Sequence, residues 1–187
     1  MISSPTHRES PISRPITVSV LPASGFNLTI DADESERAAL AAAHDLVAVH
    51  RFHTDLEIKR WRKDGVRLRG RIQANVEQTC VVTLEPLESV IDAEFDAVFL
   101  PEGSKLRRPL DSDGALLIDP NGPDAPETFE HGILDAGAVA EEFFELEIDP
   151  FPRTPGAELP EAGDPAGEGS DTGENPFAGL RALKNKL

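Results

Sequence analysis

Apolar and polar residues alternate along two long stretches of the chain, which is the pattern of a β-strand with one buried face. The first stretch covers residues 66–76 and the second covers residues 89–101. The polar face of the second stretch carries three carboxylates: Asp92, Glu94 and Asp96. Shorter runs rich in β-branched residues at 14–30 and 45–58 add further strands. The chain is therefore predicted to be rich in antiparallel β-structure.

Two segments switch to helical patterning. Residues 34–43 are rich in alanine and follow Asp31 and Asp33, either of which can accept the free amide hydrogens of a first helical turn. Residues 135–147 form the second predicted helix, with Asp135 as its N-cap. Apolar residues recur there at near-helical spacing: Leu134, Val139, Phe143 and Leu146. Prolines end this helix shortly afterwards.

These elements predict an α+β domain over residues 14–152, with a predominantly antiparallel sheet or a partly open barrel and two short helices. Residues 1–13 are expected to be a flexible N-terminus, and residues 153–174, rich in Pro, Gly and acid, a disordered linker. Residues 175–187 predict a short amphipathic helix. Its apolar stripe, a candidate for docking to a partner, consists of Phe177, Leu180 and Leu183. Whether this helix docks on its own chain or on another stays open.

The composition narrows the class of protein. The chain has 187 residues, a net charge of −16, 39% hydrophobic residues and a single cysteine. One cysteine excludes an intrachain disulfide, and no apolar run reaches the roughly 18 residues needed to cross a bilayer. A soluble, cytoplasmic protein without membrane contact is expected. The acidic charge argues against indiscriminate nucleic-acid binding.

The charge is unevenly distributed, because residues 51–71 hold eight Lys and Arg residues against three Asp and Glu residues. Within them, IKRWRKDGVRLRGRI (residues 58–72) predicts a β-hairpin with a two-residue turn at Asp64-Gly65. In that register Arg62 faces Arg67 and Arg60 faces Arg69, so these four arginines share one face. The opposite face would hold Trp61, Val66, Leu68 and Ile72. Trp61 is accordingly expected in the core.

Guanidinium groups bind phosphate oxygens bidentately, and a nearby aromatic ring can stack on an unpaired base. The candidate RNA- or anion-binding residues are Arg60, Arg62, Arg67, Arg69 and Arg71. Two other interpretations remain open: a solvated strand face, or a face neutralised by the chain's own acids. The acidic face of the strand predicted at residues 89–101 could neutralise the arginine face. Spacing alone does not show whether this strand pairs with the arginine-bearing strand.

Other chemistry is weakly indicated. His50 and His53 lie in a predicted strand, where residues three apart face opposite ways, so they are expected to be structural or surface residues. Asp111 and Asp113 lack the remaining ligand spacing of a Ca²⁺ loop. Cys80 lies in a valine-rich segment and is expected to be a buried, unreactive thiol. No phosphate-binding loop and no hydrolase motif occurs. We predict no metal, no cofactor and no enzymatic activity.

Three blocks in order carry a family resemblance: QTCVVTLEP (78–86), ILDAGAVAEEFFELEIDPFPRTPGA (133–157) and NPFAGLRALK (175–184). They resemble the YceD family of large ribosomal RNA subunit accumulation proteins. The resemblance implies a bacterial cytoplasmic protein needed for normal levels of 23S ribosomal RNA, and it brings no active-site assignment. Some members carry a C-x-x-C pair where this chain has Cys80 and Thr83. The missing second cysteine rules out metal binding through that pair.

Two functional hypotheses follow. The first is a non-enzymatic factor for 23S ribosomal RNA processing and large-subunit assembly, which contacts ribosomal RNA or an assembly partner through the basic hairpin. The second is an acidic, chaperone-like module that escorts a basic ribosomal protein or recruits a processing enzyme through its C-terminal helix. The expected partners are thus ribosomal RNA, large-subunit assembly intermediates or a ribosome-biogenesis protein.

Overall fold

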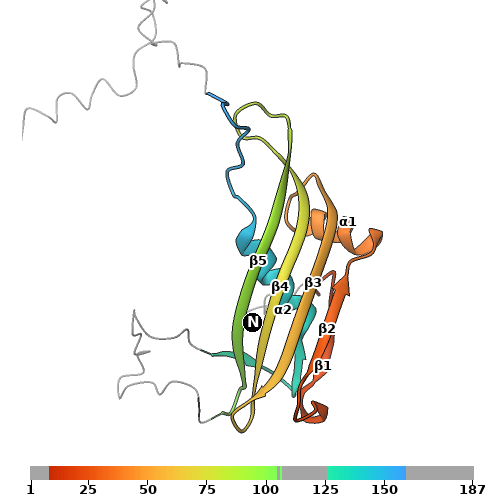
Figure 1. The fold of residues 1–187 in the computed structure, drawn as a ribbon, viewed down its shortest axis with the longest axis vertical. Coiled ribbons are helices and arrows are strands. Elements are labelled where there is room, and N and C mark those ends of the chain that lie inside the picture. Colours follow the sequence, from red (N-terminus) through yellow and green to blue (C-terminus); the bar gives the residue numbers. More distant parts are fainter. Residues whose placement is uncertain (1–8, 105, 107–125, 159–187) are drawn as a thin grey trace, which may run out of the picture. The chain divides into compact units, whose positions relative to one another are not determined.

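A computed structural model describes residues 9–104, 106 and 126–158 of the chain. Five strands form the main sheet in the order β2-β3-β4-β5-β6, and β1 pairs with β7 in a two-stranded sheet (Figure 1). The strands are β1 (Pro15–Thr17), β2 (Phe26–Asp31), β3 (Ala48–Trp61), β4 (Gly65–Thr79), β5 (Pro86–Pro101), β6 (Glu127–Phe129) and β7 (Ile133–Asp135). The helices are η1 (Val18–Val20, 3-10), α1 (Glu34–Ala43) and α2 (Ala136–Glu147).

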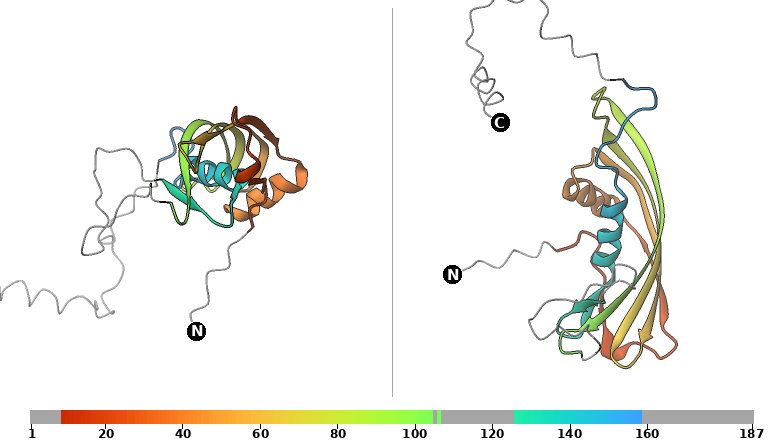
Figure 2. Two further views of the ribbon diagram at one scale, coloured as in Figure 1. Left: turned by 90° about the horizontal axis from the view of Figure 1, so that it is seen from below. Right: turned by 90° about the vertical axis from the view of Figure 1, so that its left-hand side faces the viewer.

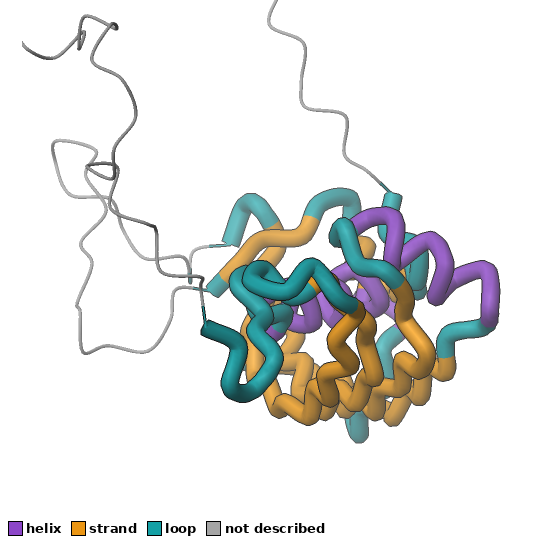
Figure 3. The backbone as a smooth tube through the Cα atoms, turned by 90° about the horizontal axis from the view of Figure 1, so that it is seen from above, coloured by secondary structure: helices purple, strands orange, loops and turns teal. Residues whose placement is uncertain are grey.

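The main sheet is antiparallel from β2 to β5, and only the short β6 runs parallel to its neighbour β5. The three central strands curve around α2, which lies on the concave side of the sheet (Figures 2 and 3). The predicted α+β class, with an antiparallel sheet and two α-helices, is confirmed. The sheet stays open and does not close into a barrel.

The core lies between the concave face of the sheet and α2. Phe144 is fully buried, and its ring meets the ring of Phe52 edge to face at 5.3 Å between centroids. One residue earlier, Phe143 stacks on Phe95 of β5 at 4.3 Å. Gly70 faces Phe95 from β4, and a Cβ atom there would collide with the phenylalanine ring. The glycine therefore lets an aromatic ring lie flat across the strand, as expected for glycine within a sheet.

Both α-helices begin at aspartate caps. Asp33 accepts the backbone N–H of Glu36, and the Glu36 carboxylate accepts the backbone N–H of Asp33, which completes a capping box at α1. Asp135 accepts the backbone N–H groups of the next turn and caps α2. The predicted helices at 34–43 and 135–147 are thus confirmed, because both were recognisable from local capping chemistry.

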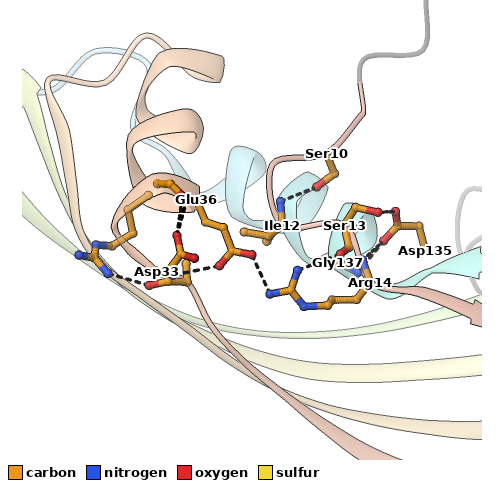
Figure 4. A network of polar contacts seen from close by, with 11 residues as sticks. Ser10, Ile12, Ser13, Arg14, Asp33, Glu36, Asp135 and Gly137 are labelled. Carbon is orange, nitrogen blue, oxygen red and sulfur yellow. Dashed lines mark hydrogen bonds and ion pairs between the residues drawn. The ribbon is translucent and has the colours of Figure 1, made fainter.

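Asp135 also fixes the N-terminal segment (Figure 4). Its carboxylate accepts the hydroxyl of Ser13 and the backbone N–H of Arg14, the latter at 2.7 Å. The Arg14 guanidinium in turn contacts Glu36 of the α1 capping box at 2.7 Å. Ile12 is fully buried. Structure therefore begins ahead of residue 14, the predicted domain boundary, and the prediction of a flexible segment up to residue 13 needs this correction for residues 9–13.

Several predicted features lie outside the described residues. These are the turn at Asp111 and Asp113, most of the acidic linker at 153–174, and the C-terminal helix at 175–187 with its candidate docking residues Phe177, Leu180 and Leu183.

Candidate functional site

The convex face of the sheet carries charged rows that alternate in sign from strand to strand. Arg67, Arg69 and Arg71 form a basic row on β4. The facing residues on β3 are Lys59, Glu57 and Asp55, and those on β5 include Glu94 and Asp96. The acidic strand predicted from its alternation therefore does pair with the arginine strand, and like charges are mostly separated from one another.

The β4 arginines bind the β5 carboxylates directly. Arg71 donates two hydrogen bonds to Asp92, at 2.7 and 2.8 Å, and Arg67 holds Asp96 in the same bidentate way. Arg69 donates to Asp96 as well, at 3.0 Å. These bonds lower the pKa of Asp92 and of Asp96, chiefly through Arg71 and Arg67 respectively. Of the three interpretations left open by the sequence, neutralisation by the chain's own acids describes this row.

The turn of the β3–β4 hairpin differs from the predicted one. Residues 62–64 form a three-residue turn, and Gly65 already pairs with Trp61. Arg62 adopts a left-handed backbone with φ of 53°, so the conformation favoured by glycine falls three residues earlier than predicted. The two-residue turn at Asp64-Gly65 was therefore wrong.

This turn changes which side chains share a face. Arg60 pairs with Val66, not with Arg69, and Arg62 lies in the turn. An odd shift in register exchanges the two faces of one strand relative to the other. The prediction that four arginines share one face is therefore wrong. The prediction that Trp61 lies in the core is also wrong. Its side chain is half-buried and lies on the same face of the sheet as the basic row on β4.

The turn and the end of β3 form a compact cationic group, the hairpin tip, defined as residues 60–64. The Arg60 guanidinium donates to the backbone carbonyl of Leu21 at 2.8 and 3.0 Å, and to that of Ser19. The Arg62 guanidinium lies over the Trp61 ring at 4.4 Å from its centroid. Within the described part of the chain, neither arginine nor Lys63 has a carboxylate at ion-pair distance, unlike the row on β4.

A histidine clamped by two aspartates lies elsewhere on the convex face. His53 on β3 contacts Asp31 of β2 at 2.6 Å through Nδ1 and Asp55 at 3.2 Å through Nε2. Thr29 donates its hydroxyl to Asp55 at 2.7 Å and holds that carboxylate in place. The hydrogen bond to Asp31 raises the pKa of His53. His50, by contrast, contacts Glu77, so the two histidines of the H-x-x-H pattern serve separate contacts.

We expect the His53 clamp to make stability depend on pH. A pKa raised in the folded state adds stability that is complete below the unfolded value of about 6.5 and is lost as pH rises through the folded pKa. His53→Gln should therefore lower the free energy of unfolding by about 0.5 kcal/mol at pH 5.5 and by less at pH 9. Urea unfolding at both pH values measures this. His131→Gln is the matched control, since the His131 side chain is 86% exposed. A pH-independent loss for His53→Gln would contradict the clamp.

Cys80 is a buried free thiol, so the burial predicted for it is confirmed. Its sulfur accepts the backbone N–H groups of Thr83 and Thr154, both at 3.4 Å, and these bonds lower the pKa of the thiol to about 6. The backbone N–H of Val81 donates to Pro152 at 2.9 Å. The turn after β4 and the segment after α2 therefore lie side by side. The two segments belong to the blocks at residues 78–86 and 133–157, two of the three blocks that carried the family resemblance.

An acidic groove lies beside α2. The end of α1, the segment before β1 and the strands β6 and β7 form its other walls. Its carboxylates belong to Glu9, Glu130, Asp135, Glu141, Glu142 and Glu145, and its one imidazole to His44. His44 contacts Glu141 at 3.0 Å. Burial and the neighbouring Glu142 raise the pKa of Glu127 on β6. The groove is thus suited to cationic groups.

Among residues 9–104, 106 and 126–158, no three His, Cys, Asp or Glu side chains are grouped as the ligands of a metal ion would be. Neither described α-helix is long and apolar enough to cross a membrane.

The sequence did not indicate the tethering role of Asp135 or the close approach at Gly137. A Cβ atom at Gly137 would collide with the backbone carbonyl oxygen of Ile12, so the N-terminal segment crosses the first turn of α2 where only glycine fits. The available sequence signal was a glycine two residues after the capping aspartate, at a helical position where glycine is unfavourable. This signal does not identify the segment that crosses the helix there.

The fold and the charged face define a small α+β protein with an open, curved antiparallel sheet. The family model described as "Large ribosomal RNA subunit accumulation protein YceD" matches residues 68–184, which is more than half of the chain. The chain belongs to the YceD family, and this membership gives it a role in accumulation of the large ribosomal RNA subunit. Searches of curated proteins and of solved structures each gave no match.

Proposed function

We propose that this protein is a non-enzymatic factor acting in the cytoplasm on large-subunit assembly, and that it contacts 23S ribosomal RNA through its hairpin tip. The family supports the ribosomal role. The observation that supports the contact is the difference between two sets of cations. The β4 arginines hold carboxylates, whereas Arg60, Arg62 and Lys63 have no carboxylate partner among the residues that the structure describes.

The β4 row is a poor phosphate site for a simple electrostatic reason. A phosphate that approaches Arg67 or Arg71 must displace an aspartate held on the adjacent strand by two hydrogen bonds. It must also approach the carboxylate row that remains beside it. We therefore move the proposed contact away from Arg67, Arg69 and Arg71, and we retain Arg60 and Arg62 from the residues that the sequence singled out.

At the hairpin tip the cations are partly pre-arranged. Arg60 is held by backbone carbonyls, and the Arg62 guanidinium lies over the Trp61 ring, which restricts its motion. One carboxylate, Asp64, lies in the same turn, so the tip keeps an excess of positive charge. The family match begins at Leu68, after the tip, so this contact rests on geometry.

Charge reversal at the tip tests the contact. Arg62→Glu combined with Lys63→Glu should weaken association with large-subunit precursors by about tenfold or more, and the loss should shrink at high salt. Both residues are exposed, so the fold should persist. Arg51→Glu with Arg153→Glu makes the same change in charge at exposed positions elsewhere. Co-sedimentation in sucrose gradients and 23S levels are the measurements; equal behaviour of both double variants would contradict the contact.

The acidic groove favours a second candidate, the escort of a basic ribosomal protein or the recruitment of a processing enzyme. The same gradients separate the two functions. If association survives charge reversal at the tip but is lost when residues 175–187 are deleted, the contact is made to a protein through the C-terminal segment.

A further inference from the structure

The outer edge of β5 is largely unpaired. β5 extends from Pro86 to Pro101 and pairs along its inner side with β4 from end to end. On its other side, within the described part of the chain, it pairs only through Phe99–Pro101 with β6. The peptide groups of alternate residues between 87 and 98 therefore face outward without a neighbouring strand in the described part of the chain, which is the usual template for adding one.

The side chains beside this edge have a distinct character on each face. On the convex side, Glu88 and Glu94 have no hydrogen bond or ion pair within the described residues, and Val90 is 76% exposed. On the concave side the positions near the edge are small and half-buried: Ser89, Ala93 and Ala97. Leu146 follows Phe143, which stacks on β5, by one turn of α2 and is 72% exposed. Exposed apolar surface therefore remains on α2, the helix that packs on the concave side of the sheet.

We propose that this edge binds an extended segment of a partner protein in which basic and apolar residues alternate, and that the segment adds to the sheet as a further strand. The charges on the convex face predict the charge of the partner segment. The row on β4 is basic and the row on β5 is acidic, so a strand added beside β5 is expected to carry basic residues on this face. Apolar residues on the other face of the added strand would pack beside the small, half-buried residues on the concave side of β5. This interface goes beyond the RNA contact and does not depend on it.

The charges also argue against a second copy of this chain as the occupant. Edge-to-edge pairing of two β5 strands would place acidic residues on neighbouring strands, because residues 87–98 contain Glu88, Asp92, Glu94 and Asp96 but no Lys or Arg. Like charges at facing positions are destabilising. Natural edges are usually blocked by proline, lysine or a bulge. Here the prolines stand only at the two ends of β5, so a partner strand of opposite charge can pair along the length between them.

A peptide of ten residues that alternates Lys and Val, added to the full-length protein, tests the proposal. Binding should be measurable by calorimetry, and the backbone amide signals of residues 87–98 should shift in NMR spectra. N-methylation of one alternate set of peptide amides should weaken binding at least tenfold, whereas methylation of the other set should not, because only one set faces β5. A peptide with Glu in place of Lys should not bind.

Variants of the protein complete the test. Glu88→Lys with Glu94→Lys should abolish binding, whereas Glu34→Lys with Asp45→Lys, which reverses two charges at exposed positions on and directly after α1, should leave it intact. Equal binding by both methylated peptides, shifts confined to the groove beside α2, or no binding at all would overturn the proposal. So would binding that appears only after residues 159–187 are deleted, since the chain's own C-terminal segment would then be the occupant.

Discussion

Phe144→Ala is expected to lower the free energy of unfolding by about 3–5 kcal/mol. The side chain is fully buried and packs edge to face on Phe52 at 5.3 Å and on His44 at 5.6 Å, so it joins the sheet, α1 and α2. Its removal leaves a cavity at the centre of the core. A domain is typically stable by about 5–15 kcal/mol, so the loss should be evident in urea unfolding followed by the fluorescence of the single tryptophan, Trp61.

Phe151→Ala provides the matched control. The same side chain is removed, but Phe151 is 69% exposed, and the midpoint of unfolding should change little. Equal losses for the two variants would contradict the position of α2 against the concave face of the sheet.

Gly137→Ala is expected to destabilise the protein by about 2 kcal/mol, although alanine favours a helix over glycine by about 1 kcal/mol. The added Cβ collides with the backbone oxygen of Ile12, so the N-terminal segment must move away. That movement breaks the contacts of Ser13 and Arg14 with Asp135. Hydrogen exchange should show lost protection at residues 10–16 together with the lower free energy of unfolding.

Gly103→Ala is the control for this substitution, because no atom lies within 4 Å of a Cβ built at Gly103. It should be close to neutral. A Gly137→Ala protein that is more stable than the wild type, with the N-terminal segment still protected from exchange, would show that the segment does not cross α2 at this point.

Features governed by neighbouring residues were predictable from the sequence. Asp33 and Asp135 are short polar caps directly before runs that favour helix, and both helices begin where expected. The alternation at residues 89–101 likewise gave the correct buried face of β5, since Ile91, Phe95 and Phe99 are buried. In each case the pattern lies within one element and needs no information from elsewhere in the chain.

The candidate site was less predictable because it depends on register. Asp64-Gly65 is a strong turn signal, yet the turn is made by residues 62–64 with a left-handed Arg62. The tertiary pairing of Gly65 with Trp61 outweighs the local preference. The carboxylate partner of each β4 arginine could not be predicted either, because it also depends on how the strands pair. Asp92 and Asp96 are more than twenty residues away from the arginines they bind, and only the β4–β5 pairing brings them together.

Ultraviolet crosslinking in living cells, with both the RNA and the protein partners sequenced, tests the central claim most directly. If the hairpin tip contacts ribosomal RNA, crosslinked nucleotides should map to 23S precursors, and the modified peptide should contain Trp61. The yield should fall in the Arg62→Glu, Lys63→Glu protein and persist in the Arg51→Glu, Arg153→Glu control. Crosslinks to proteins alone, or RNA crosslinks that leave the tip peptide unmodified, would contradict the proposed RNA contact.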